Sequence, residues 1–72
     1  MVNQEEIQPG VIVRGRRDGP PDRLIVRRVA NEVFWTPRKK DGTFDSGNAL
    51  RQCFISTICE WGSKVIKREE RD

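Results

Sequence analysis

Apolar residues recur at every second position in several short stretches of the chain, and this alternation is typical of β-strands. The densest apolar run covers residues 23–36 and is interpreted as a β-hairpin with strands over 23–29 and 33–36. The residues between these strands are expected to turn, with Asn31 adopting a positive φ. Pro37 limits the extension of the second strand. We expect the rest of the chain to pack around this hairpin.

Three further strands are predicted outside the hairpin. The Pro9-Gly10 turn delivers the chain into a strand over residues 11–16. Residues 50–55 alternate in polarity and predict the fourth strand in chain order. Residues 64–67 predict a short fifth strand. The chain is therefore expected to form five strands.

A short helical turn is predicted between the last two strands. Thr57 and Glu60 have the T-x-x-E spacing of a capping box, in which each side chain bonds a backbone N–H of the other residue. The turn is expected to end at Trp61, with Gly62 as its C-cap. A rival fold has one longer helix over 56–67, but a glycine in its middle would cost about 1 kcal/mol.

Two polar segments are expected to be loops. Residues 17–22 combine an Asp-Gly turn with a stiff Pro-Pro exit. Residues 37–49 are long for a loop in so small a domain and contain two turn signals, Asp41-Gly42 and Ser46-Gly47. This second segment is either an open loop or a small hairpin with Thr43-Phe44 inside it.

These elements predict a mainly β protein, a small SH3-like barrel of about five antiparallel strands with one short helical turn between strands 4 and 5. The 72 residues allow one domain at most, and an apolar fraction of 35% makes its core small. The predicted domain covers residues 9–67. It follows a flexible N-terminus over 1–8 and precedes a charged, disordered tail over 68–72.

The first part of this domain has a pattern that is similar to known domains. Pro9-Gly10 precedes the apolar residues 11–13, a glycine-bearing loop follows, and Leu24-Ile25-Val26 begins the next strand. Over residues 9–29 this order resembles the start of KOW and Tudor domains, and the resemblance implies an SH3-like barrel. The five aromatic residues include no tyrosine, which a full Tudor-type cage for methylated ligands usually contains.

Charge is distributed unevenly along the chain. The net charge is +3, but residues 14–40 hold nine basic and three acidic side chains, which makes this segment +6. Acidic residues gather near both ends. A basic middle indicates an anionic partner for one face of the protein. The alternative is a solvated surface on a small soluble protein.

The composition argues against catalysis. The chain has no histidine, which is the commonest general base, and no Gly-rich phosphate loop. Cys53 and Cys59 cannot complete a four-ligand zinc site, and both are expected to be reduced thiols used for packing. We therefore predict no catalytic residue, metal or cofactor. The chain begins without the features of a signal peptide and has no apolar run near the ~20 residues of a membrane span, so a cytoplasmic protein with no membrane partner is predicted.

The best candidates for a binding surface are basic residues, because a guanidinium donates two parallel hydrogen bonds to phosphate. The candidates are Arg14, Arg16, Arg17, Arg27, Arg28, Arg38, Lys39 and Lys40. Trp35 and Phe44 are candidates for stacking on a base. Phe34 and Trp35 point to opposite faces of their strand, so Trp35 is either a core residue or a stacking residue. Phe44 is expected to be the exposed aromatic residue, and Trp61 to close one end of the barrel.

Three functions are compatible with this sequence. The first is a non-enzymatic module that contacts nucleic acid, RNA or DNA, or a nucleic-acid-processing complex, with salt-sensitive affinity and little sequence preference. The second is a phage-type small regulator that binds a host protein with an acidic patch, such as RNA polymerase or a nuclease, through residues 37–49 and an exposed aromatic residue. The third is a subunit that self-associates through a strand edge and Val65-Ile66.

Overall fold

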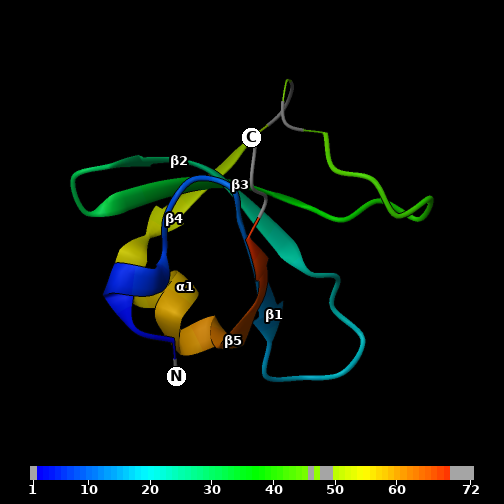
Figure 1. Cartoon of the computed structure of the whole chain (residues 1–72), viewed down its shortest axis with the longest axis horizontal. Helices are drawn as coiled ribbons and strands as arrows, with labels where there is room; N and C mark the ends of the chain where they lie inside the picture. The colour runs from blue at the N-terminus through cyan, green and yellow to red at the C-terminus, as the bar shows by residue number, and fades with distance from the viewer. Residues whose placement is uncertain (1, 46, 48–49, 69–72) are drawn as a thin grey trace.

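The computed structural model describes residues 2–45, 47 and 50–68 of the chain. Within these residues the chain forms one antiparallel sheet and one α-helix (Figure 1). The elements are η1 (Gln4–Glu6), β1 (Val11–Gly15), β2 (Arg23–Val29), β3 (Glu32–Pro37), β4 (Arg51–Phe54), α1 (Ile55–Trp61) and β5 (Gly62–Arg68). The predicted mainly β fold, with five antiparallel strands and one short helical segment between strands 4 and 5, is confirmed.

The sheet curls around the core without closing into a barrel. Its strand order is β4-β3-β2-β1-β5, so β4 and β5 are its edges and do not pair with each other within the described residues. Figure 1 shows α1 and the N-terminal segment on the open side of the sheet, and α1 contacts β4, β5 and η1. The predicted barrel is therefore only approximate, because a helix rather than strand pairing bridges the two edges.

The β2–β3 hairpin begins and ends close to its predicted limits. Val29 pairs with Glu32, which leaves a two-residue connection. The positive φ of this turn, 53°, falls on Ala30 and not on Asn31 as predicted. A register shift lies between Ile25 and Arg27, so β2 has a bulge in its middle. Bulges bend a strand and re-aim its side chains, which accounts for the mixed polarity of both faces of β2.

The core fills the concave side of the curled sheet. Val13, Ile25 and Val33 from the three central strands are fully buried, and Ile58 from α1 is buried against them. Trp35 is 6% exposed and belongs to the same cluster. Trp35 is therefore a core residue, which is one of the two alternatives predicted for it.

The N-terminal segment is part of this core in the structure, and the flexibility expected of residues 1–8 stays a prediction. Val2 and Ile7 are buried, and Asn3 caps η1 through a capping box with Glu6. Arg28 of β2 donates from Nη1 to the carbonyl oxygens of Gln4 and Ile7, both at 3.1 Å. Two apolar side chains that cover the open side of the sheet hold the segment in place, so the domain begins before residue 9.

Helix α1 begins earlier than predicted. Its N-cap is Phe54, which makes no side-chain cap hydrogen bond, so the predicted Thr57–Glu60 capping box does not form. Both residues instead lie inside the helix. The helix starts at Ile55 because Ile55, Ile58 and Cys59 share the i, i+3, i+4 spacing that buries one face against the core.

Gly62 is the C-cap of α1, as predicted, although its φ of −79° is open to any residue. Glycine is needed here because there is no room for a side chain. A Cβ atom at this position would lie 2.6 Å from Val13 Cγ1 and 3.0 Å from Val2 Cγ2. The close approach lets the chain pass directly from α1 into β5 against the core.

The segment after β3 folds back as a small hairpin, which is one of the two alternatives considered for it. Arg38 and Phe44 form an isolated β-bridge, and the backbone N–H of Lys39 donates to the carbonyl oxygen of Thr43 at 2.8 Å. Asp41 accepts hydrogen bonds from both the hydroxyl and the N–H of Thr43, which lower its pKa. We call residues 38–44 the small hairpin; positions 46, 48 and 49 lie outside the described residues.

The C-terminal part of the chain is described as far as residue 68. Arg68 belongs to β5, where its backbone pairs with Val11. The rest of the predicted tail, residues 69–72, lies outside the described residues. Within the described part of the chain, no helix is both long and apolar enough to cross a membrane.

Candidate nucleic-acid interface

The side chain of Arg23 lies between two tryptophan rings. Its Cζ is 3.8 Å from the ring centroid of Trp35 on β3 and 3.8 Å from that of Trp61 at the end of α1. Burial lowers the pKa of Arg23, and the charge of Arg51 lowers it further. The guanidinium still stays charged, because arginine does not lose its proton in proteins. This stack joins the start of β2 to the end of α1.

Trp61 is held from a second direction by β1. A Cβ atom at Gly15 would lie 2.7 Å from Trp61 Cζ2, so the ring rests directly against the strand backbone. The backbone N–H of Arg16 donates to the Trp61 carbonyl oxygen at 3.0 Å. Trp61 is therefore fixed in position by contacts from two strands while it remains partly exposed.

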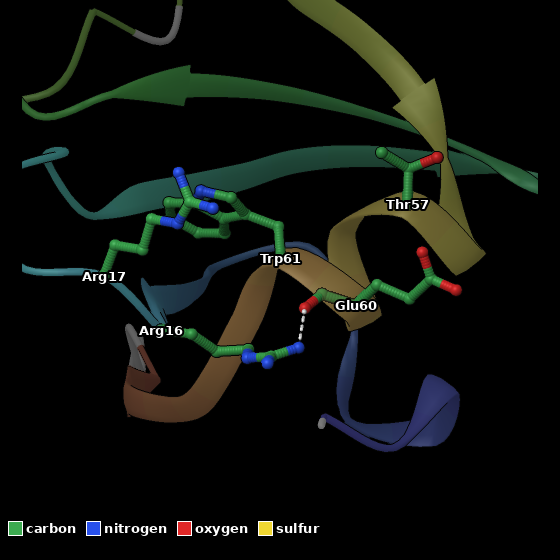
Figure 2. A pocket seen from close by; sticks show the side chains of 5 residues that line it. All are labelled: Arg16, Arg17, Thr57, Glu60 and Trp61. Atoms are coloured by element: carbon green, nitrogen blue, oxygen red, sulfur yellow. Dashed lines mark hydrogen bonds between the residues drawn. The ribbon is translucent and has the colours of Figure 1, made fainter.

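Beside Trp61 the surface is hollowed by about 520 Å³. Five residues line this space, which we call the α1 hollow: Arg16, Arg17, Thr57, Glu60 and Trp61. Figure 2 shows the two arginines entering from the end of β1 and the residues after it, with Thr57 and Glu60 on the helix. Arg16 Nη1 donates to the Glu60 carbonyl oxygen at 3.4 Å. The hollow thus has a cationic side and a helical side.

Several polar groups of the α1 hollow have no partner. Within the described part of the chain, the side chains of Arg17, Thr57 and Glu60 make no hydrogen bond and no ion pair, and all three residues are exposed. A ligand that enters the hollow would therefore displace water rather than an internal contact. With two arginines and one glutamate, the hollow carries a net charge of +1 and is suited to an anion.

Two more of the predicted arginines share one carboxylate near the start of β2. Arg14 Nε lies 3.3 Å and Arg38 Nη2 lies 3.5 Å from the oxygens of Asp22. Arg14 remains largely exposed. The Asp22 carboxylate is only 13% exposed, so it needs one of these partners. Arg38 also donates to the Gly42 carbonyl oxygen at 2.9 Å, so Arg14 is the guanidinium that can turn to an external anion more easily.

The structure divides the predicted set of binding residues. Arg16 and Arg17 line the α1 hollow, and Lys39 and Lys40 are exposed in the small hairpin. Two other arginines have partners within the protein: Arg28 binds the N-terminal segment, and Arg27 lies 6.0 Å from the Phe34 ring. Trp35 is in the core. Phe44 is half-buried, with the Cζ of Arg38 4.7 Å from its ring centroid. The predicted stacking roles of Trp35 and Phe44 are not favoured by their burial.

Three residues of the interface were missing from the predicted set. Thr57 and Glu60 were interpreted as a helix cap, and Trp61 as a residue that closes the end of a barrel. Their meeting with the residues after β1 spans more than 40 positions of sequence. No local pattern marks this meeting, because it depends on the pairing of β5 with β1.

The exposed aromatic residue is Phe54, at 60%, whereas Phe44 was predicted. Phe54 pairs across the sheet with Glu32, and Glu32 pairs with Val29, which is 43% exposed. Gln52 donates to the Glu32 carboxylate at 2.6 Å. We call Val29 and Phe54 the apolar patch; it lies on the edge strand β4 and the end of β2.

The two cysteines are free thiols that pack against the core. Burial raises the pKa of both. At Cys53 the rise is opposed by the indole N–H of Trp35 and by the charge of Arg23. The Trp35 indole N–H is buried and has no hydrogen-bond partner within the described residues; the sulfur of Cys53, beside it, is at best a weak acceptor for this donor.

Comparison with known proteins assigns no family to this chain. No protein-family model, curated protein or solved structure matches the chain. The resemblance to KOW and Tudor domains therefore stays a prediction. The α1 hollow and the apolar patch are the two surface features from which a function can be inferred.

Proposed function

We propose that this protein is a non-enzymatic binding module that holds single-stranded nucleic acid at the α1 hollow. In this proposal the exposed edge of Trp61 contacts a base, and the adjacent phosphates are bound by Arg16 and Arg17. The observation that carries the proposal is an anchored, partly exposed tryptophan beside an arginine with no internal partner. Basic grooves with aromatic side chains are the usual way of binding single strands.

The rigidity of Trp61 supports this role. Arg23 covers one face of its ring and Gly15 the other, so little conformational entropy remains to be lost when the exposed edge of the ring contacts a ligand.

The charges around the hollow support a polyanion rather than a single small anion. Arg14 on β1 and Arg38 at the start of the small hairpin both pair with Asp22, and Lys39 and Lys40 extend the positive charge along the small hairpin. A strand that leaves the hollow in this direction would meet several further cations. The free thiols agree with a reducing compartment, and we place the module in the cytoplasm.

Salt-dependent binding of labelled oligonucleotides tests this proposal. The probes are fluorescent single-stranded RNA, single-stranded DNA and duplex, and their anisotropy is measured with the wild type, Arg17→Ala and Arg27→Ala. Salt is varied between roughly 50 and 300 mM because counterion release dominates such binding. Both substitutions remove one exposed arginine. We expect Arg17→Ala to weaken single-strand binding and to reduce the slope of log K against log salt by about 0.7.

The control separates a site from a general charge effect. Arg27 is not among the residues that line the hollow; it lies near the β2–β3 turn, where Phe34 is its aromatic neighbour. If Arg17→Ala and Arg27→Ala weaken binding equally, the hollow is not the site. If no oligonucleotide binds at low salt, the protein is not a nucleic-acid-binding module.

A second candidate function is favoured by the apolar patch. Phe54 is the most exposed large hydrophobic side chain of the described residues, and an exposed aromatic residue on an edge strand is a typical anchor for a protein partner. The protein would then regulate a host protein, with Phe54 in the role that was predicted for Phe44. A pulldown from nuclease-treated extract distinguishes the two functions: a protein retained in stoichiometric amount by the wild type and lost with Phe54→Ser supports the regulator.

A further inference from the structure

Two arginines lie against one buried tryptophan on the concave side of the sheet. The Cζ of Arg23 is 3.8 Å from the ring centroid of Trp35, and the Cζ of Arg51 is 5.5 Å from the same centroid. Arg23 belongs to β2 and Arg51 to β4, the two strands that pair with β3 on either side of Trp35. Because the ring is packed into the core, it gives both guanidinium groups a fixed support.

Stacking leaves only the edge of the Arg23 guanidinium open to a ligand. Trp35 covers one face of the group and Trp61 covers the other. A guanidinium is planar, so its N–H donors point outward in the plane that the two rings leave uncovered. Within the described part of the chain, the arginines that donate side-chain hydrogen bonds are Arg14, Arg16, Arg28 and Arg38. The donors of Arg23 are therefore held in place without a partner.

Both guanidinium groups are accessible from outside. Arg23 is half-buried, and the only enclosed side-chain nitrogen without a partner among the described residues is that of Trp35, so the donors of Arg23 reach solvent. Arg51 is exposed and makes no ion pair within the same residues. A ligand can thus contact both arginines without displacing an internal contact.

The two arginines bring like charges together. The charge of Arg51 lowers the pKa of Arg23, as expected of a neighbouring cation. Neither group forms an ion pair with a carboxylate within the described residues. An anion that contacts both would remove their repulsion. The partial burial of Arg23 strengthens this attraction, because the local dielectric constant is lower than that of water.

The charge and shape of the site favour a phosphate monoester. Near pH 7 such a group carries a charge of about −1.5 to −2 and has three terminal oxygens. Each phosphodiester within a strand carries only one negative charge. A guanidinium donates two parallel hydrogen bonds to phosphate oxygens, so two of them can bind one phosphate group through all its terminal oxygens. A monoester can therefore balance both arginines, which a diester cannot.

We propose that Arg23 and Arg51 form a binding site for a phosphate monoester. Arg23 supplies a rigid fork, and the exposed Arg51 turns towards the same phosphate. The site adjoins the α1 hollow, because Trp61 contacts Arg23 and also lines the hollow. The terminal phosphate of a single strand is the ligand that suits both places, and in this respect the inference rests on the proposed function. The phosphate site itself does not depend on it.

Three short RNAs that differ only at their ends test the use of this site for strand ends. The probes are UUUUU with a 5′-phosphate, with a 3′-phosphate and with hydroxyl groups at both ends. Each is titrated into the intact protein by calorimetry at constant salt. We expect one phosphorylated strand to bind about tenfold more tightly than the hydroxyl-ended strand, because it gains charge-assisted hydrogen bonds.

A matched pair of variants assigns this preference to the site. Arg51 and Arg27 are both exposed strand residues with an aromatic neighbour, at 5.5 and 6.0 Å, so neither substitution puts the fold at risk. We expect Arg51→Gln to reduce the preference for the terminal phosphate to about threefold or less, and Arg27→Gln to leave it unchanged. Arg17→Ala should weaken all three strands by the same factor, because it acts on the hollow.

Inorganic phosphate tests the site without nucleic acid. It is titrated into the isotope-labelled protein while the side-chain Nε–H signals of the arginines are followed by nuclear magnetic resonance, with chloride at equal ionic strength as the control. We expect phosphate to shift the signals of Arg23 and Arg51 and to leave that of Arg27 in place. In Arg51→Gln the shift of the Arg23 signal should need about tenfold more phosphate.

The possible failures are distinguishable. If the three strands bind equally and phosphate shifts neither signal, the inference is wrong, while the proposed function stands. If the preference for a terminal phosphate survives in Arg51→Gln, that phosphate binds elsewhere and the inference is also wrong. If phosphate shifts both signals but the strands bind equally, the phosphate site stands and its use for strand ends is wrong. If no strand binds even at low salt while phosphate shifts both signals, the proposed function fails and the phosphate site stands.

Discussion

Arg23 stacks on the indole ring of Trp61, with its Cζ 3.8 Å from the ring centroid. The opposite partner of the guanidinium is Trp35, a buried residue of the core. One arginine thus links the interior of the sheet to the aromatic residue of the candidate interface. Stability and ligand binding are therefore expected to depend on the same side chain.

Substitution of Arg23 should lower both stability and oligonucleotide affinity. Two stacked cation–π contacts, partly withdrawn from water, contribute about 1–2 kcal/mol each, so Arg23→Ala should lower the free energy of unfolding by about 2–3 kcal/mol in a urea titration. Arg23→Lys keeps the charge but not the planar stack and should lose more than half of that amount. Arg27→Ala, with its ring partner at 6.0 Å, is the control and should change stability by less than about 0.5 kcal/mol. Equal losses at Arg23 and Arg27 would contradict the stack.

Gly15→Ala should displace Trp61. The new Cβ would lie 2.7 Å from Cζ2 and 2.8 Å from Cε2 of the ring, closer than side-chain atoms tolerate. Overpacking of this kind costs about 1–3 kcal/mol, and a shifted ring should change the tryptophan emission spectrum and weaken single-strand binding. Gly47→Ala is a suitable control, because nothing lies within 4 Å of a Cβ there. An unchanged spectrum for Gly15→Ala would show that Trp61 is not held by β1.

Arg28→Ala should loosen the N-terminal segment. The two hydrogen bonds from Arg28 to the carbonyl oxygens of Gln4 and Ile7 are charge-assisted, and such bonds contribute about 1.5–3 kcal/mol each at most. Hydrogen exchange should become faster at the amide of Ile7, which bonds the Gln4 oxygen, with little change in oligonucleotide affinity. If exchange in residues 2–8 is already fast in the wild type and unaffected by the substitution, the flexible N-terminus predicted from the sequence is confirmed.

The sequence predicts the strands well because their signal is local. The apolar period of β2 and the turn after it place the hairpin within a residue or two, and the polarity pattern of residues 50–55 places β4. The N-terminal segment was missed because Val2 and Ile7 are isolated apolar residues in a polar stretch, without a period. The T-x-x-E pattern was misleading, since burial of Ile55 and Ile58 decides where α1 begins.

The candidate interface is less predictable because it depends on contacts between distant parts of the chain. Counting charges singled out Arg16 and Arg17, and the structure brings both to the α1 hollow. It also included Arg28, whose partners are main-chain oxygens that no pattern of side chains reveals. The meeting of Glu60 with the residues after β1 requires the strand order of the whole sheet, and this order becomes visible only once the chain is folded.

Stability should fall as the pH rises above about 9. Burial raises the pKa of Cys53 and Cys59 above the ordinary value of 9.0, so the folded protein holds these protons to a higher pH than the unfolded chain. Between the two pKa values the unfolded chain binds fewer protons, and the free energy of unfolding therefore decreases with pH. The stabilising effect is fully present below pH 9 and is lost progressively above it. The chain has no tyrosine, so no phenol titrates in this range.

Urea titrations from about pH 7 to about pH 10.5 under reducing conditions measure this loss, because this range spans the ordinary thiol pKa of 9.0. Cys59→Ala serves as the comparison, because it removes the more deeply buried thiol. Its stability should be lower at pH 7, where a small cavity replaces the sulfur, but should decline less steeply above pH 9. A decline of the same steepness in both proteins would mean that the Cys59 thiol titrates equally in the folded and unfolded chains. Its burial would then have no consequence for the pH dependence of stability.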